Sequence, residues 1–260
     1  MTSLVLSRVE NKIGYITINR PETRNGLTPE LLHEFIAIVQ RFDADPDVRV
    51  MLVTGAGADF SSGGDKAFLR TVQKMSPDQV RNQIYGAFLG GVRALKLCGK
   101  PTIAAINGGA VGAGCELAVA ADFRVMAPKS FLHENWTAVG TIPPLGGMFL
   151  LPRLIGLERA SNMIMRAQRV YGPEALAIGL ATKLSEEGKM LEVAEDLARD
   201  IAKRSPKALA WAKVGLRRGM EGTLAGEWDF NLLAQGTLIA GPDFAEWLDA
   251  IEAKREPNYA

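Results

Sequence analysis

Two largely apolar runs that are rich in β-branched residues, 48–54 and 101–106, constrain the fold of this 260-residue chain more than any other feature. Strands that are apolar throughout are buried by helices on both faces. An amphipathic helical pattern over 29–45 precedes the first run, and another, from Ser76 to about Leu97, precedes the second. Strands and helices in alternation indicate right-handed crossovers and a largely parallel sheet. The expected fold class is therefore α/β.

Shorter elements are expected on either side of these runs. Residues 5–9 and 13–18 alternate between apolar and polar around a short turn, which predicts an antiparallel hairpin. After the second run, the sequence predicts a short helix from about Gly112 to Ala121, a strand over 123–126 and an irregular stretch over 127–145.

Helices dominate the chain from Gly146 onward. Several have clear start signals, such as a proline at the first helical position followed by an acid. These helices are predicted over 146–155, 158–168, 173–178, 190–203, 206–219, 224–239 and 242–254. We expect residues 1–200 to form the core and residues 201–260 a helical oligomerisation region.

Composition excludes several classes of function. The chain has 30 basic and 29 acidic residues, so its charge offers no electrostatic basis for binding nucleic acid or an anionic membrane. Cys98 and Cys115 lack metal-site spacing, which argues against a zinc site or a disulfide framework. No stretch resembles a signal peptide or a membrane span. A cytoplasmic location is expected.

A glycine-rich segment, 107–117, follows the second apolar run and leads into the carboxylate of Glu116. Small residues let a backbone approach a ligand closely, and a helix that begins near Gly112 points its free N–H groups at that ligand. Alternatively, these residues only allow close packing of a helix on a strand. A second small-residue loop, 60–65, follows the first run. The carboxyl ends of parallel strands share one sheet edge, so each loop could donate an amide to one oxyanion.

Five motifs in order resemble the crotonase (enoyl-CoA hydratase/isomerase) superfamily. They are Asn19-Arg20-Pro21 with Asn25 and Leu27, Phe60 to Asp65, Lys100 to Gly108, Gly112 to Leu117, and Gly140 to Pro143. The resemblance implies a core of ββα superhelix, a C-terminal trimerisation region, and a homotrimer or dimer of trimers. It also implies an acyl-coenzyme A thioester as substrate, with coenzyme A as part of that substrate and no metal or other cofactor.

The resemblance places the oxyanion amides on Gly64 and Ala113 and a catalytic glutamate on Glu116. Removing one oxyanion donor from an enzyme that depends on it costs about 3–4 kcal/mol. Glu116 would help to deprotonate a water that attacks C3 of the acyl chain. Contacts with the acyl group or coenzyme A are expected at Arg24, Asn25, Leu27, Ser62, Asp65, Lys66, Trp136 and Gly140.

The second glutamate of hydratases is displaced here. The family pattern places this acid four residues after the phenylalanine that matches Phe131 and four residues before the glycine that matches Gly140. In this chain the first count gives Asn135 and the second gives Trp136. Glu134 is the nearest acid, and three interpretations stay open. Glu134 protonates C2, as in a hydratase, or Glu116 works without it, aided by His133 as a proton carrier. In the third, residues 133 and 134 belong to an exposed loop and Trp136 only lines the acyl pocket.

The function expected from these motifs is that of an enoyl-CoA hydratase, which adds water across a 2,3 double bond. The alternative is an isomerase or hydrolase of the same fold that uses Glu116 as its main acid and base. Some relatives bind RNA through a lysine-rich helix. Here the first predicted helix carries four acids and a single arginine, so RNA binding is disfavoured.

Overall fold

The computed structural model describes residues 3–259 except for the side chain of Gln83, and its largest element is a six-stranded sheet. The strands in spatial order are β1 (Val5–Glu10), β2 (Ile13–Ile18), β3 (Val50–Gly55), β4 (Thr102–Ile106), β6 (Phe123–Met126) and β9 (Lys183–Leu184). Only the pair β1–β2 is antiparallel. The predicted hairpin and the largely parallel sheet are therefore confirmed.

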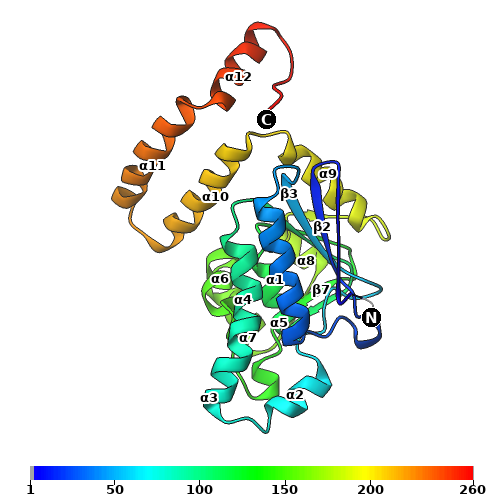
Figure 1. Ribbon diagram of the computed structural model, residues 1–260. Helices are drawn as coiled ribbons and strands as arrows, with labels where there is room; N and C mark the ends of the chain where they lie inside the picture. The colour runs from blue at the N-terminus through cyan, green and yellow to red at the C-terminus, as the bar shows by residue number, and fades with distance from the viewer. Residues whose placement is uncertain (1–2, 260) are drawn as a thin grey trace.

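Helices cover both faces of this sheet, as its apolar strands require (Figure 1). Met51 and Val53 of β3 pack into one core cluster with α1 (Pro29–Ala44), α4 (Tyr85–Leu97) and α5 (Ala113–Ala120). Val50 and Leu52, which point the other way, pack against α9 (Met190–Ala202). The helix predicted from Gly112 thus belongs to the first of these layers.

A second sheet was not predicted. It joins β5 (Gly109–Val111), β7 (Phe131–His133) and β8 (Arg169–Tyr171). β5 lies inside the glycine-rich segment, and β7 interrupts the stretch that was expected to be irregular. Strands of three residues are too short to show an alternating pattern, so they cannot be predicted from periodicity.

The helix expected from Ser76 to Leu97 is divided. The capping box at Ser76 is present, but α3 (Pro77–Gln79) passes into a π-helical turn, η2 (Val80–Ile84), before α4 begins. One more helix, α2 (Lys66–Val72), was not predicted and starts directly after the loop 60–65. It is capped by Asp65, so the loop leads straight into a helix.

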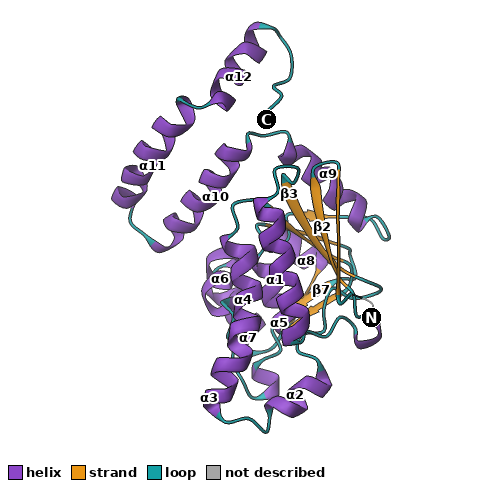
Figure 2. Cartoon of the chain, in the orientation of Figure 1, coloured by secondary structure: helices purple, strands orange, loops and turns teal. Residues whose placement is uncertain are grey.

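The helices after Gly146 agree with prediction to within a few residues. They are α6 (Gly147–Ile155), α7 (Leu157–Met165), α8 (Gly172–Ala177), α9, α10 (Pro206–Glu221), α11 (Leu224–Ile239) and α12 (Pro242–Glu252). Figure 2 shows α11 and α12 projecting away from the sheet. The boundary expected at residue 200 falls inside α9. Among residues 3–259, no helix is long and apolar enough to span a membrane.

Candidate active site

The loop 60–65 lies directly against the start of α5. Ser61 N–H donates to Gly109 O at 3.0 Å, and Val111 N–H donates to Ser61 O at 2.9 Å. A Cβ atom on Gly114 would lie 2.7 Å from Ser61 Cβ, which only a glycine avoids. Gly112 precedes the helix with φ 52° and ψ −119°, a conformation that also favours glycine. The small residues of both motifs therefore allow one close contact.

The N–H group of Gly64 points away from Leu27, which forms hydrogen bonds with the residues on either side of Gly64. Leu27 N–H donates to Gly63 O at 2.7 Å, and Asp65 N–H donates to Leu27 O at 2.9 Å. Amides alternate in direction along an extended chain, so the intervening Gly64 N–H faces the opposite side. Within residues 3–259, neither Gly64 N–H nor Ala113 N–H donates a hydrogen bond. Both expected oxyanion donors are thus free.

Glu116 is held in the first turn of α5 and is 1% exposed. Its Oε1 accepts hydrogen bonds from Leu145 N at 2.9 Å and Gly147 N at 2.7 Å. Burial raises the pKa of Glu116 to about 7, although these backbone amides oppose the rise. The glycine pair at 146–147 is the sequence feature that points to this contact.

Glu134 lies opposite Glu116, despite its displaced position in the sequence. A Cβ atom on Gly147 would lie 3.0 Å from Glu116 Oε1 and 3.2 Å from Glu134 Oε1, so the two oxygens are no farther apart than these distances combined. Glu134 is fully buried, and this raises its pKa to about 8, with a further contribution from the charge of Glu116. An exposed loop at Glu134 is therefore excluded.

The two carboxyl groups titrate as one system because they are buried and close. Between about pH 7 and pH 8 the pair holds one proton, which gives one carboxylate and one carboxylic acid. A general base and a general acid are most effective when their pKa values lie near the working pH. The pair of Glu116 and Glu134 can therefore remove one proton from a substrate and supply another near neutral pH.

His133 is not brought into this pair. Its Nε2 lies 3.0 Å from Ala167 O, and the ring is half-buried. Burial lowers the pKa of His133, and the charge that acts on it is that of Arg169 rather than that of a glutamate. The imidazole is therefore directed toward the Ala167 carbonyl, and the structure offers no support for a shared proton path.

Most of the residues expected to contact coenzyme A hold their own loop together. Arg24 donates two hydrogen bonds to Asp59, at 2.7 and 3.0 Å, and its side chain is 64% exposed. The side chain of Asn25 is buried and bonds to backbone atoms of Arg20, Ala56 and Asp59. Leu27 is buried, and Ser62 Oγ donates to Thr23 O at 3.1 Å.

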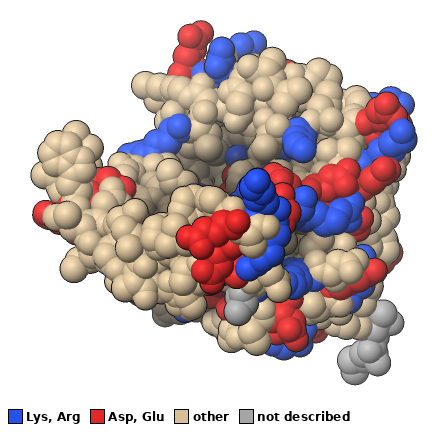
Figure 3. Space-filling model, turned by 90° about the horizontal axis from the view of Figure 1, so that it is seen from above, with Lys and Arg blue, Asp and Glu red and all other residues tan. Residues whose placement is uncertain are grey.

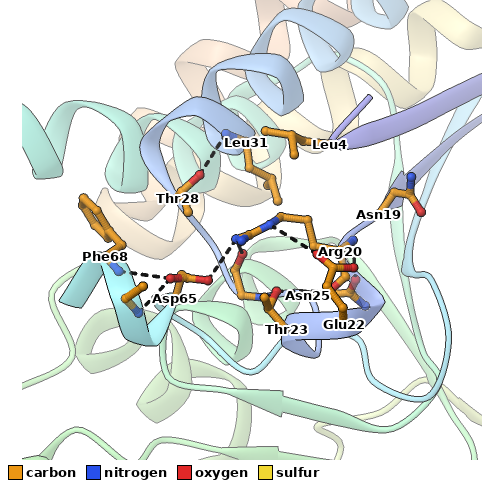
Figure 4. A network of polar contacts seen from close by, with 12 residues as sticks. Leu4, Asn19, Arg20, Glu22, Thr23, Asn25, Thr28, Leu31, Asp65 and Phe68 are labelled. Carbon is orange, nitrogen blue, oxygen red and sulfur yellow. Dashed lines mark hydrogen bonds and ion pairs between the residues drawn. The ribbon is translucent and has the colours of Figure 1, made fainter. Parts of the chain in front are cut away.

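Asp65 connects this loop to α2. Its Oδ1 accepts from Ala67 N at 2.9 Å and Phe68 N at 3.0 Å, while its Oδ2 lies 3.1 Å from Arg20 Nη1 (Figure 4). These partners keep the pKa of Asp65 low. Sequence reasoning missed Arg20, although it belongs to the first motif. Lys66 follows as an exposed first residue of α2.

Trp136 and Gly140 lie in the segment that follows Glu134. Carbon atoms of the indole ring are 3.6 and 3.7 Å from the position of a Cβ on Gly112, so the ring stands beside the start of α5. The indole Nε1 is buried. Gly140 is exposed with φ 82° and ends the short helix η3 (Thr137–Val139).

Comparison with known proteins agrees with the motifs. The short-chain-enoyl-CoA hydratase of Clostridium acetobutylicum is 30% identical over 256 residues, which are 97% of this chain and 95% of that one. A peroxisomal dienoyl-CoA isomerase of Arabidopsis thaliana is 27% identical over 99% of this chain and 96% of its own. The crystal structure of an enoyl-CoA hydratase from Bacillus anthracis superposes with a TM-score of 0.92, at 31% identity and 98% coverage of both chains.

The family itself is matched over nearly the whole chain. The model of the family described as enoyl-CoA hydratase/isomerase covers residues 8–260. The resemblance drawn from five motifs is thereby confirmed, and so is the fold of the crotonase superfamily. This chain belongs to the enoyl-CoA hydratase/isomerase family.

Proposed function

We propose that this protein is an enoyl-CoA hydratase, which adds water across the 2,3 double bond of an enoyl thioester. One observation carries the proposal. Two buried carboxyl groups with pKa values raised to about 7 and about 8 face each other beside two unused backbone amides. Hydration needs a base for the water, an acid for the enolate and donors for the thioester oxygen.

In the proposed reaction, the N–H groups of Gly64 and Ala113 bind the thioester oxygen. Glu116 takes a proton from a water as the water oxygen bonds to C3, and the electron pair of the double bond moves to form the enolate. Glu134 then gives its proton to C2, and the carbonyl is restored. The pair again holds one proton, now on Glu116, and its return to Glu134 completes the cycle.

The exposed Arg24 and Lys66 stand where the phosphates of coenzyme A are proposed to lie. A guanidinium and an ammonium group make charge-assisted hydrogen bonds to phosphate. Asn25, Leu27, Ser62 and Asp65 would then act by shaping the loop on which coenzyme A rests, and Trp136 and Gly140 by bounding the acyl end. Both cysteines are free thiols, which supports the expected cytoplasmic location.

Glu116→Gln tests the proposal. Glutamine keeps the shape of the side chain but can no longer accept a proton, so we expect the kcat for crotonyl-CoA to fall by about 10²–10⁴-fold. The affinity for the saturated butanoyl-CoA, measured by calorimetry, should stay within a few-fold of the original. Glu30→Gln, an exposed change on α1, is the matched control. Turnover of the Glu116 variant close to that of the unchanged protein would exclude this assignment.

An isomerase that uses Glu116 as its main acid and base is the second candidate. It is favoured by the geometry at Glu134, because neither of its oxygens has a hydrogen-bond partner of standard distance and angle among residues 3–259. A carboxyl group held so loosely is not fixed in one orientation for proton transfer. Glu134→Gln separates the two candidates. Loss of hydration in the variant supports the hydratase with Glu134 as its acid, and unchanged hydration would remove Glu134 from that role. Isomerised product without hydration in the unchanged protein supports the isomerase.

We also propose that the protein forms a homotrimer or a dimer of trimers through its C-terminal helices. The side chains of Trp228, Leu232 and Leu233 on α11 are 60, 76 and 75% exposed. Large apolar side chains clustered on a projecting helix mark an interaction surface. The family resemblance gives the expected partner as other copies of this chain.

A further inference from the structure

Four buried polar atoms around the carboxylate pair have no hydrogen-bond partner among residues 3–259. They are Glu116 Oε2, both carboxyl oxygens of Glu134, and Trp136 Nε1. Buried polar atoms are rarely left unpaired, and each exception needs an explanation. Three of the four are acceptors whenever their carboxyl group is ionised, whereas the indole N–H can only donate. The set is therefore chemically complementary.

Trp136 is placed so that its indole N–H can donate a hydrogen bond to Glu134. The two residues are separated by a single position, and the backbone of Trp136 is fixed because its carbonyl accepts hydrogen bonds from Val139 N at 3.1 Å and Thr141 N at 2.9 Å. The ring packs against the core beside Gly112. Trp136 as a whole is half-buried while its Nε1 is fully buried, so the N–H is directed inward toward the site.

Among residues 3–259, no cationic side chain acts on this carboxyl group. The titratable groups that act on Glu134 are Glu116 and Cys115, both on α5, and Cys115 is a fully buried thiol whose own pKa is raised. A thiol is only a weak hydrogen-bond donor. The indole N–H is therefore the strongest donor near Glu134 within the part of the chain that the structure describes.

Building on the proposed hydratase function, we propose that Trp136 is a positioning residue whose indole N–H donates a hydrogen bond to Glu134, directly or through one water, and aims that carboxyl group at C2. A bridging water requires a polar site with two to four partners, and the four unpaired atoms supply them. The hydrogen bond keeps the Glu134 side chain in one orientation. It also compensates for the displaced position of this acid in the sequence.

Nuclear magnetic resonance of the indole groups tests the contact without any turnover. The chain has four tryptophans, so protein labelled with ¹⁵N at the indole nitrogen gives four signals. The signal lost in Trp136→Phe belongs to Trp136. We expect its chemical shift to follow pH between about 6 and 9, the range in which the coupled pair titrates. The signal lost in Trp211→Phe, from α10, serves as the matched control and should not follow this titration.

Glu134→Gln should abolish the pH dependence of the Trp136 signal. A Trp136 signal that is constant from pH 6 to pH 9 in the unchanged protein would overturn the proposal. So would a dependence that survives in Glu134→Gln. These outcomes do not depend on hydration, so an enzyme that fails to hydrate crotonyl-CoA but shows the titration would refute the proposed function and keep the indole contact.

The kinetic test uses the Trp136→Phe variant, which keeps an aromatic ring and loses the donor. A hydrogen bond to a charged group favours the ionised form, so its loss should move the alkaline limb of the kcat/KM profile to higher pH. We expect kcat to fall by about 10- to 100-fold with KM changed by less than a few-fold. A change in KM alone, with the pH profile unmoved, would show that Trp136 only lines the acyl pocket.

Discussion

Burial of Glu134 destabilises the folded state at neutral and alkaline pH. The folded protein holds the proton of Glu134 up to a pKa of about 8, whereas the unfolded chain releases it near 4.5. The folded state therefore binds more protons between these values, and the free energy of unfolding decreases as pH rises through this window. The ionised form of Glu134, which arises when its proton is given up, is therefore the form that the folded state disfavours.

Glu134→Gln should remove this pH-dependent loss. A glutamine does not ionise, so its own burial cost is the same at every pH and cancels when one variant is compared at two pH values. We expect the stability of the variant relative to the unchanged protein to increase from pH 5 to pH 8.5 by about 4 kcal/mol. Urea unfolding at both pH values measures it, with Glu30→Gln as the control. An equal difference at the two values would contradict the raised pKa.

At the same residue scale, the sequence predicted one half of the candidate site better than the other. Gly64, Ala113 and Glu116 lie in motifs whose spacing fixes their place at the ends of two buried strands. Glu134 lies where an irregular stretch was expected, so only the fold could decide whether it reaches Glu116. The hydrogen bonds of Asn25 also escaped prediction, because a polar side chain in a loop gives no sign of the distant carbonyls that it meets.

At the scale of elements, Asp65 links the oxyanion loop to α2 in two ways. One oxygen caps the helix, and the other pairs with Arg20, whose Nη1 also donates to Gly26 O at 2.7 Å. Asparagine is as good a helix cap as aspartate, whereas alanine is not. Asp65→Asn thus removes only the ion pair, and Asp65→Ala removes both the ion pair and the cap.

We expect Asp65→Ala to be less stable than Asp65→Asn by about 1 kcal/mol, the usual value of a helix cap. Both variants should lose kcat to a similar degree, because the ion pair with Arg20 holds the loop that carries the Gly64 amide. Urea unfolding and initial rates measure the two effects. Equal stability of the two variants would mean that the cap does not stabilise α2. Unchanged rates in both variants would mean that the ion pair between Asp65 and Arg20 does not affect catalysis.

The helices whose ends carry caps or prolines were predicted more closely than those set by long-range packing. α1 and α11 begin at Pro29 and Leu224, where the sequence places them, because a threonine cap precedes each. The π-helical turn η2 leaves no trace in the apolar pattern. Strands β5, β7 and β8 form because segments distant in the sequence pair with one another, and the local sequence does not predict such pairing.

At the scale of the whole molecule, α11 packs against α10 through Trp211 and Phe230, but large apolar side chains elsewhere on the arm formed by α11 and α12 stay exposed. Figure 3 looks down on this end of the molecule, and the lobe that extends to its left is largely uncharged. Residues 224–252 contain six acids and no lysine or arginine. The adjoining helix α10 carries several basic residues, including Lys207, Arg217 and Arg218. The charged residues of the arm are thus all acidic, and the proposed contact with another copy would suit a basic surface there.

Introducing glutamates at Leu232 and Leu233 should break this assembly, because desolvating two added carboxylates on an already acidic arm opposes burial. We expect the unchanged protein to sediment as a trimer or hexamer of 28.1 kDa chains, and the double variant as a monomer. Leu6→Glu, the same kind of change on the edge strand β1, should leave the assembly intact. Analytical ultracentrifugation at micromolar concentration distinguishes these outcomes. A double variant that keeps the mass of the unchanged protein would place the interface elsewhere, and an unchanged protein that is itself monomeric would refute the proposed assembly.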